Sequence, residues 1–241
     1  MIEMPKYAPL VTVTFLAASA GLLLMVLVFI YGLAARKRWI IEVSGALATF
    51  GILLYATLLF GFSLSSSEKV LPLGGQKHFC EVDCHIAYSV TSVRNASELG
   101  SGEKLIAARG KFYVVRVQTW FDPSTIASFR GNSPLAPSPR KVVVVDDAGR
   151  EFSPSQSGQC AFELTPGAIT TPLTTPLRPN ESYSTDFVFD LPANIWNPRL
   201  FVGDADPISS LIIGHEQSPL HGKIYFALSP SIPPNNATSV R

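Results

Sequence analysis

The chain has 241 residues, an almost balanced charge and an apolar bias. Its 19 Lys and Arg residues face 18 Asp and Glu residues, so the formal net charge is +1, and 47% of the residues are hydrophobic. Nucleic-acid phosphates require clustered cations, so this balance indicates a protein with no nucleic-acid partner. The length accommodates a membrane segment and roughly one further domain.

Two long apolar runs open the chain. Residues 7–35 carry no charged side chain, and residues 39–64 carry only Glu42. Each run exceeds the ~20 apolar residues that a helix needs to cross a bilayer core of about 30 Å. Only helices satisfy all their backbone amides within one segment in lipid. We therefore predict a transmembrane helical hairpin over residues 1–64, with helices near 8–35 and 39–64.

A basic turn between the two runs determines the expected topology. Arg36, Lys37 and Arg38 outweigh the single Lys6 before the first run, and Lys and Arg are retained on the cytoplasmic side. We expect an integral membrane protein whose N- and C-termini lie outside the cytoplasm. The C-terminal domain would then stand in a periplasm or in the extracellular space, with the lipid bilayer as one partner.

The remaining residues predict a linker, an all-β domain and a tail. Residues 65–76 are polar and contain Pro and Gly, as linkers do. Residues 77–228 then alternate in short runs bounded by turn residues. The expected strands are 84–90, 111–121, the two arms of 141–152, 182–190, 199–202, 211–213 and 223–228. No helical periodicity follows Leu64, which favours one immunoglobulin-like β-sandwich. Residues 229–241 are expected to form a flexible tail.

The alternation also predicts which strand faces point inward. In residues 111–121 the apolar set Tyr113, Val115, Val117 and Thr119 forms the expected core face. A hairpin turn is expected at Asp147-Ala148-Gly149, because Asp and Gly tolerate positive φ. The Pro-rich stretches 131–139 and 165–179 are expected loops, since proline cannot donate to a sheet ladder.

The order of these segments resembles a widespread group of bacterial membrane-anchored or exported Ig-like domains of unknown function, sometimes labelled telomeric-repeat-binding-factor-like. The resemblance covers about residues 84–228 and is carried by Val-Asp-Asp-Ala-Gly-Arg-Glu-Phe, Leu-Arg-Pro-Asn-Glu-Ser-Tyr and Asp-Phe-Val-Phe-Asp-Leu-Pro. Asn180 stands where the group usually has glycine. The resemblance implies the fold and no catalytic residues, and the telomere label does not fit a chain with this topology.

Three cysteines and two histidines form the one constellation that is able to carry chemistry: His78, Cys80, Cys84, His85 and, further along, Cys160. Exported thiols are usually oxidised, so a structural disulfide with one leftover thiol is expected. A Cys80–Cys84 bridge requires Cα atoms within about 7 Å. Cys160 is the alternative partner of either cysteine.

The alternative interpretation of His78, Cys80, Cys84 and His85 is a metal site, with copper as the cofactor, because thiolates and imidazoles bind Cu, Zn or Fe. The stretch resembles the copper-binding Cys-x-x-x-Cys pair of cytochrome oxidase subunit II, which also has two N-terminal helices and an exterior β-domain. The His and Met that follow that pair are Tyr88 and Thr91 here. A c-type haem motif would need one residue fewer between the cysteines.

Other acidic and histidine residues are expected to be structural. His215 and His221 flank Glu216 in a loop and are expected to be solvated. Asp204-x-Asp206 together with Asp190 at the end of the strand 182–190 would suit calcium only in a longer loop pattern, because calcium needs six or more oxygens, so a turn is expected there instead.

No serine elbow, phosphate loop or His-Glu-x-x-His pattern occurs, so we predict a protein that is not an enzyme. The sequence favours a non-enzymatic, extracytoplasmic binding or scaffolding module for an envelope protein. A copper-dependent electron-transfer or metal-delivery protein is the alternative, and a subunit of a larger membrane complex is a third hypothesis.

Overall fold

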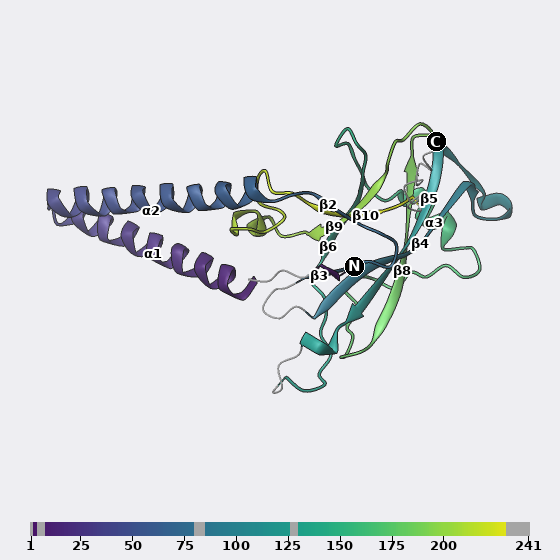
Figure 1. Cartoon of the computed structure of the whole chain (residues 1–241), viewed down its shortest axis with the longest axis horizontal. Helices are drawn as coiled ribbons and strands as arrows, with labels where there is room; N and C mark the ends of the chain where they lie inside the picture. The colour runs from purple at the N-terminus through teal and green to yellow at the C-terminus, as the bar shows by residue number, and fades with distance from the viewer. Residues whose placement is uncertain (1, 4–7, 80–84, 126–129, 230–241) are drawn as a thin grey trace, which may run out of the picture.

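The structure is a computed structural model that describes residues 2–3, 8–79, 85–125 and 130–229. It consists of a helical hairpin and a strand-rich region in two sheets, and Figure 1 shows the hairpin projecting away from the sheets. The hairpin comprises α1 (Ala8–Ala34) and α2 (Arg38–Ser65). Both bounds agree with the prediction to about one residue.

Both hairpin helices are long and apolar enough to cross a membrane, by length and composition. They meet at a tight turn, where Arg36 has a φ of 52° and the Lys37 amide donates to the Gly32 carbonyl at 3.0 Å. Gly32 is buried, and a β-carbon there would lie 3.0 Å from the Ile40 side chain. The missing side chain therefore allows the two helices to approach closely beside the turn.

Ten strands in the described residues form two five-stranded sheets. The strands are β1 (Ile2–Glu3), β2 (Lys69–Leu71), β3 (Gln76–Phe79), β4 (Ile86–Leu99), β5 (Ile106–Phe121), β6 (Arg140–Val145), β7 (Glu151–Phe152), β8 (Ser182–Leu191), β9 (Arg199–Asp204) and β10 (Ile224–Ala227). One sheet has the order β1-β3-β4-β5-β8, and the other has the order β2-β10-β9-β6-β7. Short helical segments are η1 (Gly102–Lys104), η2 (Pro123–Thr125), α3 (Gln156–Phe162) and η3 (Pro207–Leu211).

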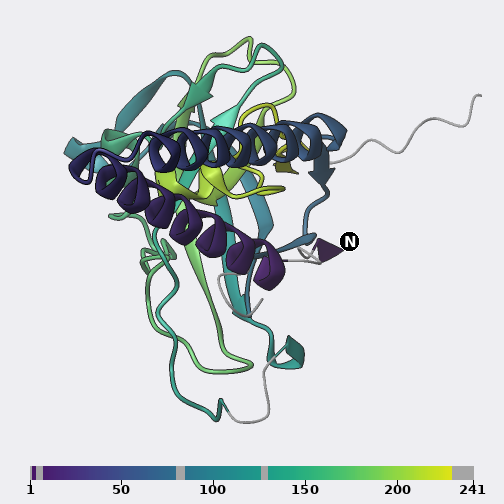
Figure 2. The same ribbon diagram turned by 90° about the vertical axis from the view of Figure 1, so that its left-hand side faces the viewer.

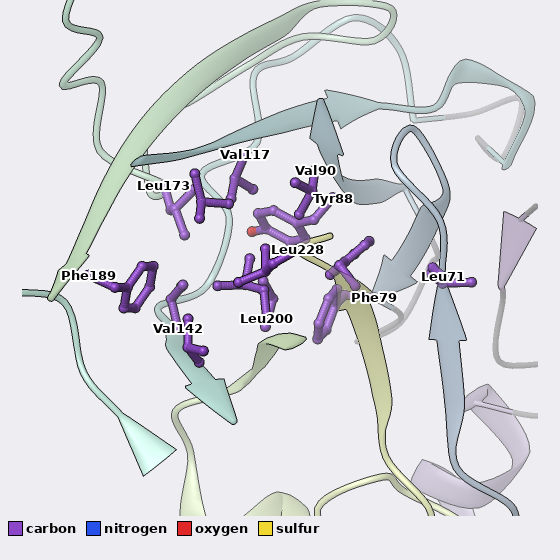
Figure 3. Close-up of a cluster of buried hydrophobic side chains, with 14 of the residues drawn as sticks. Leu71, Phe79, Tyr88, Val90, Val117, Val142, Leu173, Phe189, Leu200 and Leu228 are labelled. Carbon is purple, nitrogen blue, oxygen red and sulfur yellow. The ribbon is translucent and has the colours of Figure 1, made fainter. Parts of the chain in front are cut away.

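The main hydrophobic core lies between the two sheets. Tyr88, Val90 and Val117 come from the first sheet and Val142 and Leu200 from the second, and Figure 3 shows these side chains gathered in one cluster. The predicted core face of residues 111–121 is confirmed, because its apolar residues pack here. Each fully buried Val, Leu or Phe contributes roughly 1.5–3 kcal/mol relative to exposure.

A second, smaller core lies on the outer face of the first sheet and explains a wrong prediction. We expected no helix after Leu64, but α3 spans Gln156–Phe162 and Ser155 caps it, its Oγ accepting from the Gly158 amide at 3.1 Å. Phe162 packs with Phe112 and Val188. A helix of two turns is too short to produce a recognisable 3.6-residue period in the sequence.

The outer edge of β8 is covered by α3 and the Pro-rich segment that follows it. The Gln159 amide nitrogen donates to the Asp186 carbonyl at 3.0 Å, and its oxygen accepts from the Val188 amide at 3.1 Å. Thr170 pairs with Thr185. Edge strands that keep free ladder groups are templates for aggregation, so this cover protects the sheet.

Several strand predictions are confirmed and others need correction. The turn at 147–149 and the strands near 182–190, 199–202 and 223–228 are present. Residues 211–213 are not a strand, because η3 ends at Leu211 and further turns follow. The expected linker contains β2, which pairs in parallel with β10. The strand expected from Cys84 begins, in the described residues, at Ile86 and continues to Leu99.

The chain on either side of the hairpin enters a different sheet. β1 precedes α1 and pairs in parallel with β3, with Ile2 opposite Gln76. β2 follows α2 and belongs to the other sheet. In Figure 2 the hairpin lies in front of the sheets, and together with Figure 1 this view places the start of α1 and the end of α2 beside the sheets. The basic turn therefore lies at the opposite end of the hairpin.

Candidate functional site

The predicted topology determinants lie at the free end of the hairpin. Arg36, Lys37 and Arg38 are exposed, and Figure 1 shows that the α1–α2 turn is remote from both sheets. They therefore share no site with the histidines, which lie in or next to the strands.

His78 is the best-formed of the predicted chemical residues. It lies in β3 and is almost fully buried, and its Nε2 is 3.1 Å from a carboxylate oxygen of Asp122. Asp122 also accepts from the Ser124 amide at 2.8 Å and from its hydroxyl at 2.6 Å. The sequence did not single out Asp122, which follows the last residue of β5 and reaches β3 only across the folded sheet.

Burial and hydrogen bonding act in opposite directions on Asp122. Burial raises the pKa of this carboxyl, but the hydrogen bonds from Ser124 and His78 outweigh it, so the pKa lies below its usual value. The other ring nitrogen of His78, Nδ1, is buried and has no hydrogen-bond partner among the described residues. Such an arrangement leaves one imidazole nitrogen available while a carboxylate orients the ring.

The remaining members of the predicted cysteine and histidine constellation are only partly placed. His85 is buried just before β4 and stacks on the Phe121 ring, with 5.1 Å between the ring centroids. Cys80 and Cys84 lie outside the described residues. Within the described part of the chain, no three His, Cys, Asp or Glu residues form a group suited to a metal ion.

Cys160, the third disulfide candidate, lies in α3 and carries a free, exposed thiol. No disulfide occurs in the portion that the structure describes, and that portion contains no other cysteine. A bridge between Cys80 and Cys84 stays a prediction.

A buried lysine forms the centre of a charged cluster between the sheets. The sequence analysis did not identify this residue. Lys77 in β3 is 3% exposed, and its ammonium lies 2.7 Å from the Glu216 carboxylate and 2.6 Å from the Val202 carbonyl. The same nitrogen is 4.9 Å from the centroids of the Phe79 and Phe201 rings. Burial lowers the pKa of Lys77, and the attraction to Glu216 partly opposes that shift.

A second buried pair extends this cluster. Arg140 forms an ion pair with Asp204 and lies over the Phe79 ring at 4.1 Å. His215 Nε2 is 3.1 Å from the other Asp204 oxygen. The cluster joins β3 of one sheet to β6 and β9 of the other. Buried charges of this kind are tolerated when they are paired and hydrogen-bonded.

The expectation that His215 is solvated is wrong. Its ring is mostly buried, and this burial lowers its pKa below the usual value, with the Lys77 and Arg140 charges acting in the same direction and Glu216 in the opposite one. Its neutral Nδ1 accepts from the Gln217 amide at 3.1 Å. His221 is partly buried and interacts locally with the Gly222 carbonyl.

The three aspartates weighed as calcium ligands do not converge. Asp190 accepts from the Arg109 and Gly110 amides on β5. Asp206 caps η3 by accepting from the Ile208 amide, and Asp204 belongs to the ion-pair cluster. The expectation of a local turn therefore holds for Asp206, whereas Asp190 and Asp204 are strand residues.

The comparisons with known proteins give no family. No protein-family model matches the chain, and no curated protein matches it. A structural similarity exists to a crystal structure of a conserved hypothetical protein from Bacillus anthracis, with 15% sequence identity and a TM-score of 0.39. That similarity covers 52% of this chain and 89% of the other.

Proposed function

We propose that the protein is a non-enzymatic, membrane-anchored binding or scaffolding module that presents its two sheets outside the cytoplasm to an envelope protein partner. The observation that supports the proposal is the connection between the hairpin and the sheets, here called the joint, which consists of β1 before α1 and residues 66–71 after α2. β1 and β2 flank the hairpin at its two ends, and each is a strand of a different sheet. An anchor incorporated in both sheets holds them in a defined position above the bilayer.

Further contacts make this joint stiff. The Gly222 amide donates to the Ser66 hydroxyl just beyond α2 at 2.7 Å, and Glu68 forms an ion pair with Arg199 of β9. These contacts occur in the segment that the sequence suggested was a linker. A module on a stiff joint presents the same surface to every partner, which reduces the ordering cost of binding.

We propose an extracytoplasmic location from the charge of the turn. Arg36, Lys37 and Arg38 lie at the end of the hairpin that is remote from the sheets, and retention of this end in the cytoplasm puts the sheets on the opposite side of the membrane. The paired sheets and the φ of +68° at Asn180, where the resembled Ig-like group usually has glycine, support assignment to an Ig-like fold.

A reporter fusion tests this topology. Alkaline phosphatase fused after Arg241 is expected to be active in the original chain, because it requires an oxidising compartment. Replacement of Arg36, Lys37 and Arg38 by Gln is expected to reduce that activity and to increase the fluorescence of a cytoplasmic reporter at the same position. Phosphatase-negative, cytoplasmically fluorescent fusions of the original chain would contradict the proposed compartment.

Affinity capture from native membranes tests the partner. After in-membrane crosslinking, an envelope protein is expected to co-purify with the full chain and to be absent from a parallel capture with residues 1–66, which contain the hairpin and β1 but no other strand. Capture of the same set of proteins by both would show that the sheets recruit no partner.

A second candidate function is favoured by the available nitrogen of His78. The Asp122 carboxylate orients the ring, and Nδ1 has no partner in the described residues. Histidine ligands of metals commonly have this arrangement. We propose that His78 with Cys80, Cys84 and His85 would hold copper, which would supply one-electron chemistry or be delivered as cargo.

Metal analysis and thiol counting on the purified full chain separate the two candidates. Stoichiometric copper with free Cys80 and Cys84 is expected for the metal protein, and His78→Ala would abolish it while the control His221→Ala would not. Two oxidised cysteines and no bound metal after copper loading would exclude the second candidate and leave the first in place.

A further inference from the structure

We propose that residues 206–221, here called the interfacial segment, insert apolar side chains into the lipid leaflet next to α2. This inference rests on the membrane anchor of the proposed function and adds a third contact with lipid. The segment connects β9 to β10 and includes η3. In Figure 1 it extends from the sheets towards the end of α2.

A hydrogen bond sets the depth of the interfacial segment. The Tyr55 hydroxyl donates to the Leu211 carbonyl at 2.7 Å. Tyr55 precedes Ser65, the last residue of α2, by ten positions, which corresponds to about 15 Å at a rise of ~1.5 Å per residue. The long Tyr55 side chain therefore holds the segment beside the last turns of α2.

The position of Glu42 relates this contact to the edge of the hydrocarbon core. A bilayer core of about 30 Å spans ~20 helical residues. If Glu42 stays at the cytoplasmic interface, the core ends near residue 62, and Tyr55 lies inside it by roughly seven residues or ~10 Å. Leu211, which contacts Tyr55, is then at or below the lipid interface.

The side chains of the interfacial segment are sorted as a lipid contact requires. Ile208, Leu211 and Leu220 are 54%, 52% and 69% exposed. In contrast, Ser209 and Ser218 are buried, and Glu216 points inward to Lys77. Ile213 is buried and Asp206 is exposed, so the reversal of the usual arrangement of a water-exposed loop is confined to the exposed Ile208, Leu211 and Leu220 and to the buried polar residues named above.

Several backbone carbonyls of the interfacial segment accept hydrogen bonds from side-chain hydroxyls, as a medium without water requires. Among its carbonyls, Asp206 and Pro207 accept from the hydroxyls of Ser209 and Ser210, each at 2.6 Å. Ile212 accepts from the Ser218 hydroxyl at 2.6 Å, and Leu211 accepts from Tyr55. Non-helical backbone is tolerated at membrane depth when its polar groups are satisfied in this way.

Leu220 is held outward by an unusual backbone. Its φ of +65° is in the left-handed region, which β-carbons disfavour, yet its side chain is the most exposed of the three apolar residues named above. An exposed leucine in a disfavoured backbone conformation is a candidate for a functional contact. Insertion of this side chain into lipid would provide that use.

Photo-crosslinking to lipid tests the proposal on the full chain. Benzoyl-phenylalanine is placed at Leu220 or Leu211, the chain is reconstituted in phosphatidylcholine and phosphatidylglycerol vesicles, and lipid adducts are counted by mass spectrometry. Leu53, an exposed residue in the middle of α2, serves as the positive control. Leu164, an exposed leucine just after α3, is the matched negative control.

We expect lipid adducts at Leu220 at least fivefold above those at Leu164 and approaching those at Leu53. Abundant adducts at Leu53 with Leu220 at the Leu164 level would overturn the inference while the hairpin anchor stands. Absence of adducts at Leu53 as well would overturn both the anchor and the inference. Retention of the signal in a Leu211→Ser background would show that Leu220 makes its own lipid contact.

Discussion

The hairpin and the sheets treat the same residue types in opposite ways. In α1 and α2, leucines such as Leu23 and Leu53 are mostly exposed, whereas in the sheets Leu71 and Leu200 are completely buried. The sheets also bury ionised side chains, but in pairs, and the long apolar stretch of α1 contains no charge at all. The difference agrees with the proposed membrane anchor, in which the hairpin side chains would face lipid and the outer surfaces of the sheets would face water.

The largest expected effect comes from removing one partner of a buried ion pair between the sheets. Glu216→Ala removes the carboxylate from Lys77 and leaves a buried ammonium without its counterion. We expect the free energy of unfolding of the full chain in detergent micelles to fall by about 3–5 kcal/mol, measured by urea titration.

A matched glutamate checks that the effect comes from burial. Glu151 pairs with Lys141 at 2.5 Å on the surface, so Glu151→Ala is expected to cost below about 1 kcal/mol. Equal losses in the two variants would show that the Lys77 pair behaves as a surface ion pair.

A smaller loss is expected when the cover of β8 is removed. Gln159→Ala deletes two hydrogen bonds to that strand and opens its edge. We expect the free energy of unfolding to fall by about 1–3 kcal/mol. We also expect faster aggregation, measured by light scattering. Gln156→Ala, at the exposed start of α3, is the control. A Gln159 variant that matched this control would show that the edge is protected by other groups.

The strand-rich region should also lose stability at high pH. The Tyr183 hydroxyl donates to the Leu173 carbonyl at 2.6 Å, and burial raises its pKa to about 12. Because the folded pKa exceeds the unfolded value near 10, the stabilisation is complete below pH 10 and is lost as pH rises towards 12.

Tyr183→Phe tests the assignment of that slope. We expect this variant to cost about 1 kcal/mol at neutral pH through the lost hydrogen bond and to show a weaker decline between pH 10 and 12. Tyr31→Phe, in exposed α1, provides the comparison. An unchanged slope in the Tyr183 variant would assign the decline to other residues, such as Tyr225, whose pKa is also raised by burial.

The weakest expected effect concerns the contact between the two regions. Tyr55→Phe removes the hydrogen bond to Leu211 and should lower the free energy of unfolding by about 0.5–1.5 kcal/mol, measured in detergent. Thr57→Val, which removes a hydroxyl bonded only within α2, is the control. A Tyr55 effect no larger than the Thr57 effect would show that α2 and the interfacial segment are uncoupled.

The sequence predicted those parts of the fold that depend on a long and simple pattern. The hairpin bounds and the inward face of β5 follow from continuous apolar runs and from strict alternation. The missed elements are short: β1 has two residues and β2 has three. Such segments become strands only because a partner strand pairs with them. The local sequence pattern does not indicate a partner that is distant in the chain.

The candidate site was harder to predict for the same reason. His78 was selected for its neighbours in sequence, but its closest polar partner, Asp122, lies at the end of another strand. Lys77 was missed because a lysine in an alternating run normally faces water. Its burial depends on Glu216, which is remote in sequence and reaches it only when the segment after β9 has folded.

The parallel pairing of β1 with β3 constrains the order of assembly. β1 precedes α1 and β3 follows α2, so pairing of the two strands closes a loop of chain that contains the whole hairpin. In the proposed topology, the β1 edge of that sheet would stay unpaired until both helices are inserted and the amino-terminal tail has been translocated. Pairing of β1 with β3 would therefore occur only after both helices have been inserted into the membrane.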